Sequence, residues 1–146
     1  MKVVVQRCLN GSVSVDSKVV SSIDKGMVLL VAFTHDDNEA DLDYMVRKVI
    51  NLRIFDDENG VMNKSILQNG GSILSISQFT LYGDVSHGNR PSYVNSMGGS
   101  DAVKLYDLFC DKLNEYVDTK KGVFGADMKV SLINDGPVTI IIDSKK

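Results

Sequence analysis

The sequence predicts one α+β domain, built mainly on antiparallel strands that form a sheet or a partly closed barrel, with two principal helices. Four apolar, β-branched runs separated by turn signals occupy residues 3–33, before any helical pattern. Residues 42–50 and 103–116 carry apolar side chains at the three-and-four spacing of amphipathic helices. Strand-like segments return at residues 129–142 without an evident βαβ crossover, which favours the α+β class.

The first third of the chain is predicted to be a series of antiparallel strands. Asn10-Gly11 separates residues 3–9 from 12–15 and is the strongest short-range hairpin signal in the sequence. Turns at residues 16–18 and 24–26 then lead into a strand over 19–23 and an apolar strand that ends at Phe33.

Helices and connections fill the middle of the chain. Candidate caps at residues 36–38 precede the first helix, and Ser100 is a candidate cap for the second. Residues 85–99, rich in Ser, Gly and Asn, are expected to form an ordered surface loop. Cys110 falls on the apolar stripe of the second helix and is expected to lie in the core. The strands over 129–133 and 138–142 are predicted to flank a corner at Gly136-Pro137.

Composition agrees with a single domain over residues 1–146, with 43% hydrophobic and 24% charged residues. The longest apolar run, residues 27–33, is far shorter than the roughly 20 residues of a membrane-spanning helix. The first strand follows Met1-Lys2 directly, without a secretory leader, so we expect a cytoplasmic protein that does not associate with membranes.

Charge and cysteine content limit the possible partners. A formal net charge of -3 disfavours a broad nucleic-acid interface but permits contact with a short RNA end. Cys8 and Cys110 are too few for a metal cage or a disulfide framework, and we expect both to be reduced. No metal or cofactor is predicted.

The candidate site is the hydroxyl-rich stretch over residues 77–84, which follows an apolar strand. Ser77 or Thr80 could attack a carbonyl only with a general base, and neither His35 nor His87 has an acidic partner at a motif-like spacing. His35 followed by two aspartates lacks the complementary ligands of a metal site, and helix capping explains the aspartates better. Cys8 alternates with strand residues and is better explained as a buried side chain.

Gly136-Pro137 is a second candidate feature. Proline fixes its own φ and glycine permits unusual backbone angles, so the pair can present rigid carbonyl groups at a corner. A plain strand-connecting turn is the alternative.

Two motifs, Ser77-Gln78-Phe79-Thr80-Leu81 and Asn134-Asp135-Gly136-Pro137-Val138-Thr139, closely resemble those of the D-aminoacyl-tRNA deacylase family, formerly called D-tyrosyl-tRNA deacylases. The resemblance extends over nearly the full chain. Further matches are Gln6-Arg7, Arg53-Ile54-Phe55, Met62-Asn63, Arg90-Pro91-Ser92, Gly125-Ala126-Asp127-Met128 and Val130-Ser131-Leu132.

The resemblance implies a homodimeric, cytoplasmic, metal-free editing enzyme. Its substrate would be the tRNA 3' end carrying a D-amino acid or glycine, including glycine mischarged on tRNA(Ala). By the same resemblance, the substrate-binding residues would be Ser77, Gln78, Phe79, Thr80, Ala126 and Met128. Phe79 and Thr80 would have a pocket and oxyanion role and would not be nucleophiles. Gly136-Pro137 would be cis and enter the partner subunit's pocket, supported by Arg7.

This division of labour is physically reasonable. Rigid main-chain atoms at the position of an L side chain reject L-residues by clash, but exclusion alone does not reject glycine. An aminoacyl ester is already activated, so orientation and oxyanion stabilisation by amides can suffice. The family is thought to use the 2'-hydroxyl of the RNA, which agrees with the lack of a credible base in the sequence.

Three positions depart from the family pattern: Val61 stands where lysine is common, Tyr93 where phenylalanine is common, and Tyr82-Gly83 replaces other pairs. These departures put peripheral RNA contacts in question more than the reaction. The alternatives are a non-enzymatic nucleic-acid-binding protein and a hydrolase of small esters that uses Thr80 or Cys8.

Overall fold

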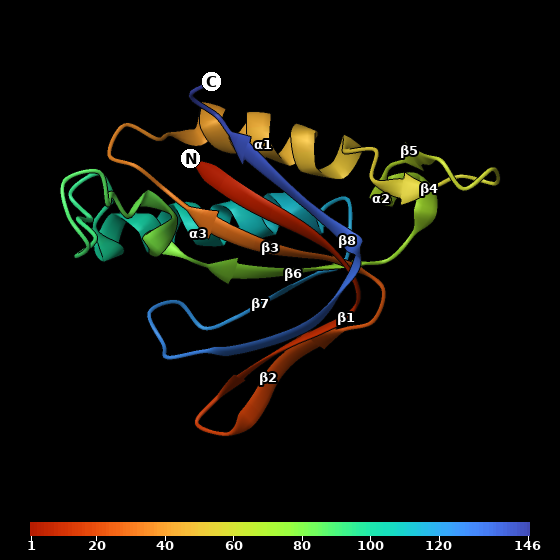
Figure 1. Ribbon diagram of the computed structural model, residues 1–146, viewed down its shortest axis with the longest axis horizontal. Helices are drawn as coiled ribbons and strands as arrows, with labels where there is room; N and C mark the ends of the chain where they lie inside the picture. Colours follow the sequence, from red (N-terminus) through yellow and green to blue (C-terminus); the bar gives the residue numbers. More distant parts are fainter.

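A six-stranded sheet that curls into a nearly closed barrel forms the centre of the computed structural model, which describes residues 1–146 (Figure 1). The strand order is β2-β1-β3-β6-β7, and β8 pairs with β1. The two ends of this order meet where Ser21 Oγ donates a hydrogen bond of 2.6 Å to the carbonyl of Lys121. The strands are β1 (Lys2–Val15), β2 (Lys18–Ile23), β3 (Gly26–Ala32), β6 (Ser72–Ser77), β7 (Thr119–Lys121) and β8 (Lys129–Asp143). The α+β class and the partly closed barrel are therefore confirmed.

The sheet is mixed, and the expectation that crossovers are absent is wrong. β3 pairs in parallel with β6, and β6 pairs in parallel with β7. The helices α1 (Glu39–Asn51) and α3 (Gly99–Asn114) lie in these two connections. Parallel neighbours require such long connections, and the local patterns do not reveal which distant strands pair.

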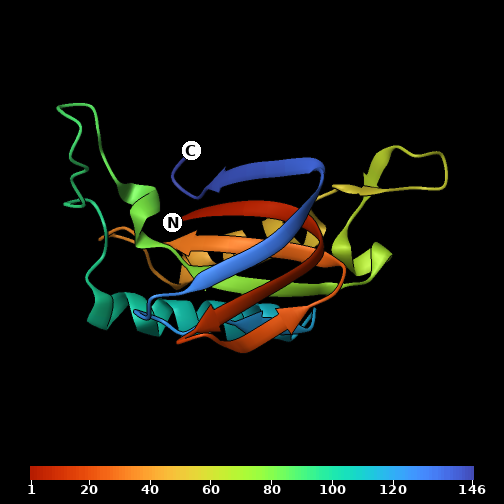
Figure 2. The same ribbon diagram turned by 60° about the horizontal axis from the view of Figure 1, so that its bottom comes forward.

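β1 runs without interruption through Asn10-Gly11, so the predicted hairpin at these residues is also wrong. The strand bends there, with register irregularities against β8 on both sides of Cys8 (Figure 2). Gly11 is buried, and a Cβ at this position would lie 2.9 Å from Val28 Cγ2. Glycine thus permits close packing inside the bent sheet. The first tight turn falls at Asp16 and Ser17, whose φ angles are 50° and 65°.

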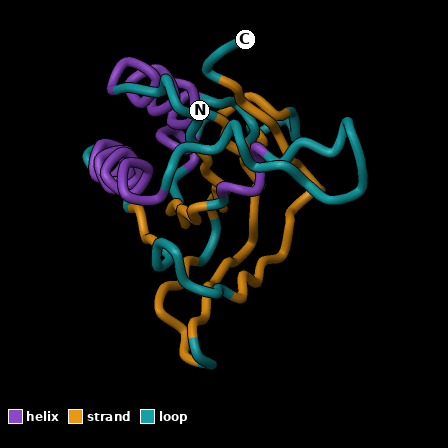
Figure 3. Tube along the Cα trace, turned by 90° about the vertical axis from the view of Figure 1, so that its left-hand side faces the viewer, coloured by secondary structure: helices purple, strands orange, loops and turns teal.

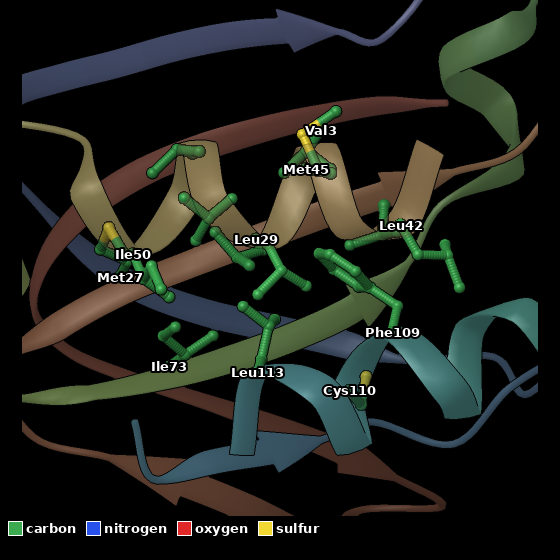
Figure 4. Packing of buried hydrophobic residues seen from close by; sticks show 14 of the residues in the cluster. Val3, Met27, Leu29, Leu42, Met45, Ile50, Ile73, Phe109, Cys110 and Leu113 are labelled. Carbon is green, nitrogen blue, oxygen red and sulfur yellow. The ribbon is translucent and has the colours of Figure 1, made fainter. Parts of the chain in front are cut away.

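Both long helices lie on the same side of the sheet (Figure 3) and cover the main core. Side chains from α1, α3 and the strands β1, β3 and β6 point toward one another in this layer (Figure 4). A second, smaller cluster fills the barrel interior: Cys8, Val13, Ile23, Val28, Leu74 and Ile76. Both cysteines are buried and unpaired, which confirms the expected core position of Cys110.

The helix starts differ in part from the sequence expectation. Asn38 caps α1 through a reciprocal capping box with Asp41. α3 begins one residue before the predicted cap Ser100, and its N-cap is Gly98, which offers no side chain. A short helix α2 (Ile66–Asn69) and a 3-10 turn η1 (Phe79–Tyr82) were not predicted. No helix has the length and apolar character needed to cross a membrane.

Asp37 is a buried anchor for the start of the chain. Its Oδ1 accepts a 2.6 Å hydrogen bond from the N-terminal amine of Met1, and its Oδ2 accepts one from the backbone of Thr34. Both members of the Met1–Asp37 ion pair are buried. Because Asn38 caps the helix, Asp37 instead joins the chain start to the segment before α1.

β8 is one continuous strand with a bend (Figure 1), and Gly136 and Pro137 lie in the segment between Asn134 and Thr139, where its register with β1 shifts. The peptide bond between Gly136 and Pro137 is cis. A separate two-stranded sheet of β4 (Phe55–Asp56) and β5 (Met62–Lys64) lies at the same end of the molecule as this bend. The predicted pair of strands is thus a single bent strand.

Candidate active site

A pocket of about 600 Å³ opens where the parallel strands β3 and β6 end. The end of a parallel pair is a common place for a ligand site, because the chain leaves both strands there in diverging loops. The lining residues from these ends are Val31, Ala32, Phe33, Ile76, Ser77, Gln78 and Phe79. The remaining ones come from the loop before α3, from α3, from the segment before β8 and from the start of β8: Tyr93, Ser96, Met97, Gly99, Ala102, Phe124, Gly125, Ala126, Asp127, Met128 and Val130.

The entry to η1 places backbone donors beside this pocket. The amide of Gln78 donates a 2.7 Å hydrogen bond to the carbonyl of Val31, which fixes the chain as it leaves β6. The amides of Phe79 and Thr80 open the 3-10 turn, where the first N–H groups have no acceptor within the helix. The side-chain amide of Gln78 donates to Thr80 Oγ1. The arrangement can therefore offer main-chain donors to a developing oxyanion.

Aromatic rings form one side of the pocket opening. Phe79 and Tyr93 meet edge to face with ring centroids 5.0 Å apart, and they are 57% and 39% exposed. Large apolar side chains left this exposed beside a pocket are typical of a surface that contacts a ligand. This contact also places Tyr93, one of the departures from the family pattern, at the pocket itself.

The pocket lining contains no histidine, cysteine, lysine or glutamate. Its single carboxylate, Asp127, is 87% exposed and lies 2.9 Å from Lys129 Nζ. His35 Nε2 lies 2.6 Å from the carbonyl of Val94 and outside the lining. A general base that could activate a hydroxyl of the protein is therefore not built into the pocket.

Cys8 has neither the position nor the ionisation of a nucleophile. Its side chain is buried in the barrel interior, and desolvation raises the pKa of the thiol to about 11. The thiolate is the reactive form, so this cysteine is inert at neutral pH. No group of three or more His, Cys, Asp or Glu side chains comes together as a possible metal site.

The bend at Gly136 is braced from inside the same subunit. Arg7 Nη1 donates to the carbonyl of Ile54 at 2.7 Å, and Arg7 Nε donates to the carbonyl of Asp135 at 3.3 Å. The side-chain amide of Asn134 donates to the carbonyls of Arg7 and Val138, both at 3.0 Å. Gly136 and Pro137 themselves are exposed. The bend is thus a projecting segment on a fixed base.

The structure brings together Ser77, Gln78, Phe79, Ala126 and Met128 of the predicted site residues around one pocket. Thr80 is adjacent but outside the lining, and its hydroxyl bonds to Gln78. Arg7, Gly136 and Pro137 lie away from this pocket in the same subunit. Sequence reasoning missed Phe33, Met97 and Phe124, because only the parallel pairing of β3 with β6 brings the end of the apolar strand to the site.

Comparison with known proteins identifies the class to which this barrel and its pocket belong. The sequence model of the D-Tyr-tRNA(Tyr) deacylase family matches residues 4–143. The chain belongs to this family, whose members are hydrolases that remove D-aminoacyl groups from tRNA.

Two solved structures are similar over nearly their whole length. One is titled c-Myc DNA Unwinding Element Binding Protein, with 39% identity, a TM-score of 0.93 and 98% of each chain covered. The other is described as a probable eukaryotic D-amino acid tRNA deacylase, with 19% identity, a TM-score of 0.84 and 97% of each chain covered. At this identity the second likeness shows the fold alone.

Proposed function

We propose that this chain is a cytoplasmic, homodimeric editing enzyme that accepts D-aminoacyl and glycyl esters of tRNA and excludes L-aminoacyl esters. The observation that carries the proposal is a pocket without a general base, combined with a braced and exposed bend at Gly136-Pro137 elsewhere on the same subunit. A pocket of this kind selects by shape and leaves proton transfer to the substrate.

Selection by handedness follows if the bend of one subunit enters the pocket of its partner. Main-chain atoms held at the position of an L side chain would clash with it, whereas a D side chain points elsewhere. Glycine has no side chain, so the same barrier admits it. Glycine mischarged on tRNA(Ala) is therefore the second substrate of this proposal.

The free surface of β8 supports a dimer. β8 pairs only with β1, so its other edge has unpaired backbone groups. Ile133 and Ile141 lie on this strand and are 53% and 72% exposed. A partner chain that covered them would bury apolar surface and bring in the bend as well.

The reaction step follows from the groups that the pocket offers. The amides of Phe79 and Thr80 would stabilise negative charge on the carbonyl oxygen as water adds to the ester. The neighbouring 2'-hydroxyl of the terminal adenosine would assist proton transfer, since no side chain in the lining is suited to that role. Breakage of the ester bond then releases the free D-amino acid and returns the proton to the ribose oxygen.

A panel of charged tRNAs tests the proposal. D-Tyr-tRNA and Gly-tRNA(Ala) are expected to be hydrolysed at least about a hundredfold faster than L-Tyr-tRNA, because an unrelieved clash costs several kcal/mol and every 1.4 kcal/mol is tenfold. Equal rates for the two enantiomers would contradict selection by the bend. Absence of hydrolysis with every ester would contradict the activity itself.

A non-enzymatic nucleic-acid-binding function is the second candidate, because the similar structure at 39% identity is titled a DNA unwinding element binding protein. The net charge of -3 weighs against a broad duplex interface. Tight, salt-sensitive binding to duplex DNA without ester hydrolysis would favour this function.

A further inference from the structure

A second cleft, of about 430 Å³, opens at the C-terminal end of α1 and is lined by Tyr44, Arg47, Lys48, Asn51, Leu52 and Arg53. Three of its six lining residues are cations, and none is a carboxylate. Arg47, Lys48 and Arg53 are all exposed. The cleft therefore concentrates positive charge on a chain whose net charge is negative.

These three cations have no ion-pair partner, whereas seven of the other thirteen lysine and arginine side chains have one. Arg7, Lys64, Lys112, Lys120, Lys121, Lys129 and Lys145 each lie against a carboxylate. None of the three cations in the cleft takes part in an ion pair. Their positive charge is thus available to an external anion.

Stabilisation of the helix end does not account for this cluster. Lys48 is the basic residue in the last turn of α1, where one cation complements the helix dipole. The carbonyl of Arg47 already accepts a 2.9 Å hydrogen bond from Asn51 Nδ2. Arg53 lies beyond the helix and is held by Asn63, to which its Nε donates at 3.0 Å. Two cations therefore exceed what the helix end needs.

The cleft opens at the C-terminal end of α1, and this end of the helix lies at the same end of the molecule as the bend in β8 (Figure 1). The connection is direct: Arg53 precedes Ile54, whose carbonyl binds Arg7, and Arg7 binds the carbonyl of Asp135 beside the bend. The pocket, in contrast, is lined by Phe33, which precedes the other end of α1. That helix is about 20 Å long at 1.5 Å per residue.

We infer that Arg47, Lys48 and Arg53 bind backbone phosphates of the tRNA acceptor stem whose 3' end occupies the partner subunit's pocket. This inference rests on the proposed function, in which the bend enters that pocket. The bend would then bring its neighbouring cleft to the edge of the partner's pocket. Guanidinium and ammonium groups bind phosphate without reading sequence, which suits an enzyme that edits many tRNAs.

The double variant Arg47→Ala/Lys48→Ala tests the inference, because neither side chain makes a hydrogen bond that holds the fold, and Arg53, which holds Asn63, stays in place. Its KM for D-Tyr-tRNA is expected to rise about tenfold. The slope of log KM against the logarithm of the salt concentration is expected to decrease by about two, because two phosphate contacts are lost. Hydrolysis of D-tyrosyl-adenosine, which lacks the stem, is expected to be unchanged. The matched control is Lys18→Ala/Lys146→Ala, which removes two exposed cations outside the cleft.

Each other outcome has a definite meaning. Equal loss on both substrates, an unchanged KM for tRNA, or the same rise in KM for the control variant would overturn the phosphate site. Failure of the wild-type protein on both substrates would contradict the proposed function instead.

A mixed dimer tests the placement across the subunits. One subunit carries Ala126→Phe, which fills its pocket, and the other carries Arg47→Ala/Lys48→Ala; the heterodimer is purified with two different tags. The remaining open pocket then faces the intact cleft of its partner, so a wild-type KM for D-Tyr-tRNA is expected. A KM as high as that of the double-variant homodimer would show that each cleft serves its own pocket and would overturn the assignment.

Discussion

Replacement of Arg7 by alanine is expected to destabilise the protein and to weaken its discrimination against L-aminoacyl-tRNA. The side chain is 10% exposed and joins the segment before β4 to the bend in β8. Its bond to the carbonyl of Ile54 is buried, and its bond to the carbonyl of Asp135 is longer and partly buried. Removal leaves both carbonyls without this donor and opens a gap beneath Gly136, which lies close to Arg7 Nη2.

The magnitude follows from these contacts. Hydrogen bonds to a charged group contribute about 1.5–3 kcal/mol each, and the longer one falls at the low end. The ion pairs with Asp56 and Asp135 add less than about 1 kcal/mol together, because these carboxylates are 53% and 39% exposed. We therefore expect a loss of about 3–5 kcal/mol and a fall in Tm of about 6–20 °C.

Thermal unfolding and the ratio of kcat/KM for D-Tyr-tRNA and L-Tyr-tRNA are the two assays. The D/L ratio is expected to fall at least about tenfold, which corresponds to 1.4 kcal/mol of lost exclusion. Arg7→Lys keeps the charge but not the forked geometry, so an intermediate result is expected. Arg90→Ala, in an exposed loop, is the control and should change neither quantity. A folded Arg7→Ala protein with an unchanged D/L ratio would refute the positioning role of Arg7.

Three further outcomes are expected. Thr80→Ala should keep activity within about tenfold of wild type, since Thr80 lies outside the pocket lining and its hydroxyl bonds to Gln78. A substrate whose terminal adenosine lacks the 2'-hydroxyl should be hydrolysed at least about a hundredfold more slowly. The opposite pattern in single-turnover assays would indicate a nucleophile on the protein. Asp37→Asn should cost about 3–5 kcal/mol in denaturant unfolding because it leaves the Met1 amine buried without its counter-charge, and an unchanged midpoint would contradict the buried ion pair. Burial raises the pKa of the Cys8 and Cys110 thiols from about 9 to about 11, so the folded state holds these protons more tightly than the unfolded state. The contribution of the two thiols to the free energy of unfolding should therefore be complete below pH 9 and decline toward pH 11. Loss of this decline in a Cys8→Ala/Cys110→Ala protein would identify the thiols as its source, and an identical decline would exclude them.

Helix placement shows how far local pattern can determine a fold. The apolar spacing of residues 42–50 and 103–116 is a property of neighbouring residues, and both helices form where it predicts them. The Asn10-Gly11 hairpin failed for the opposite reason. A glycine that permits a turn also permits close packing, and only the presence of Val28 against Gly11 decides which use applies.

Some residues of the candidate site could be predicted from sequence motifs, whereas others could be found only from the tertiary structure. Ser77, Gln78, Phe79, Ala126 and Met128 belong to motifs that the sequence displays, and they line one pocket. Phe33, Met97 and Phe124 carry no local signal, because their place in the pocket depends on the parallel pairing of β3 with β6 and on the start of α3. The cleft at Arg47, Lys48 and Arg53 is local in sequence, since its lining falls within residues 44–53, but only the tertiary structure shows that no carboxylate lies against these cations.

The sequence by itself determined the class of domain, the two helices, the two motifs and the lack of a credible catalytic base. These depend on residue identity and short spacing, which the chain carries in any conformation. Only the tertiary structure decided which strands are parallel, which side chains share the pocket, how Arg7 braces the bend at Gly136, and which cations remain unpaired. Each of these depends on contacts between residues far apart in the chain, and local propensity does not encode such contacts.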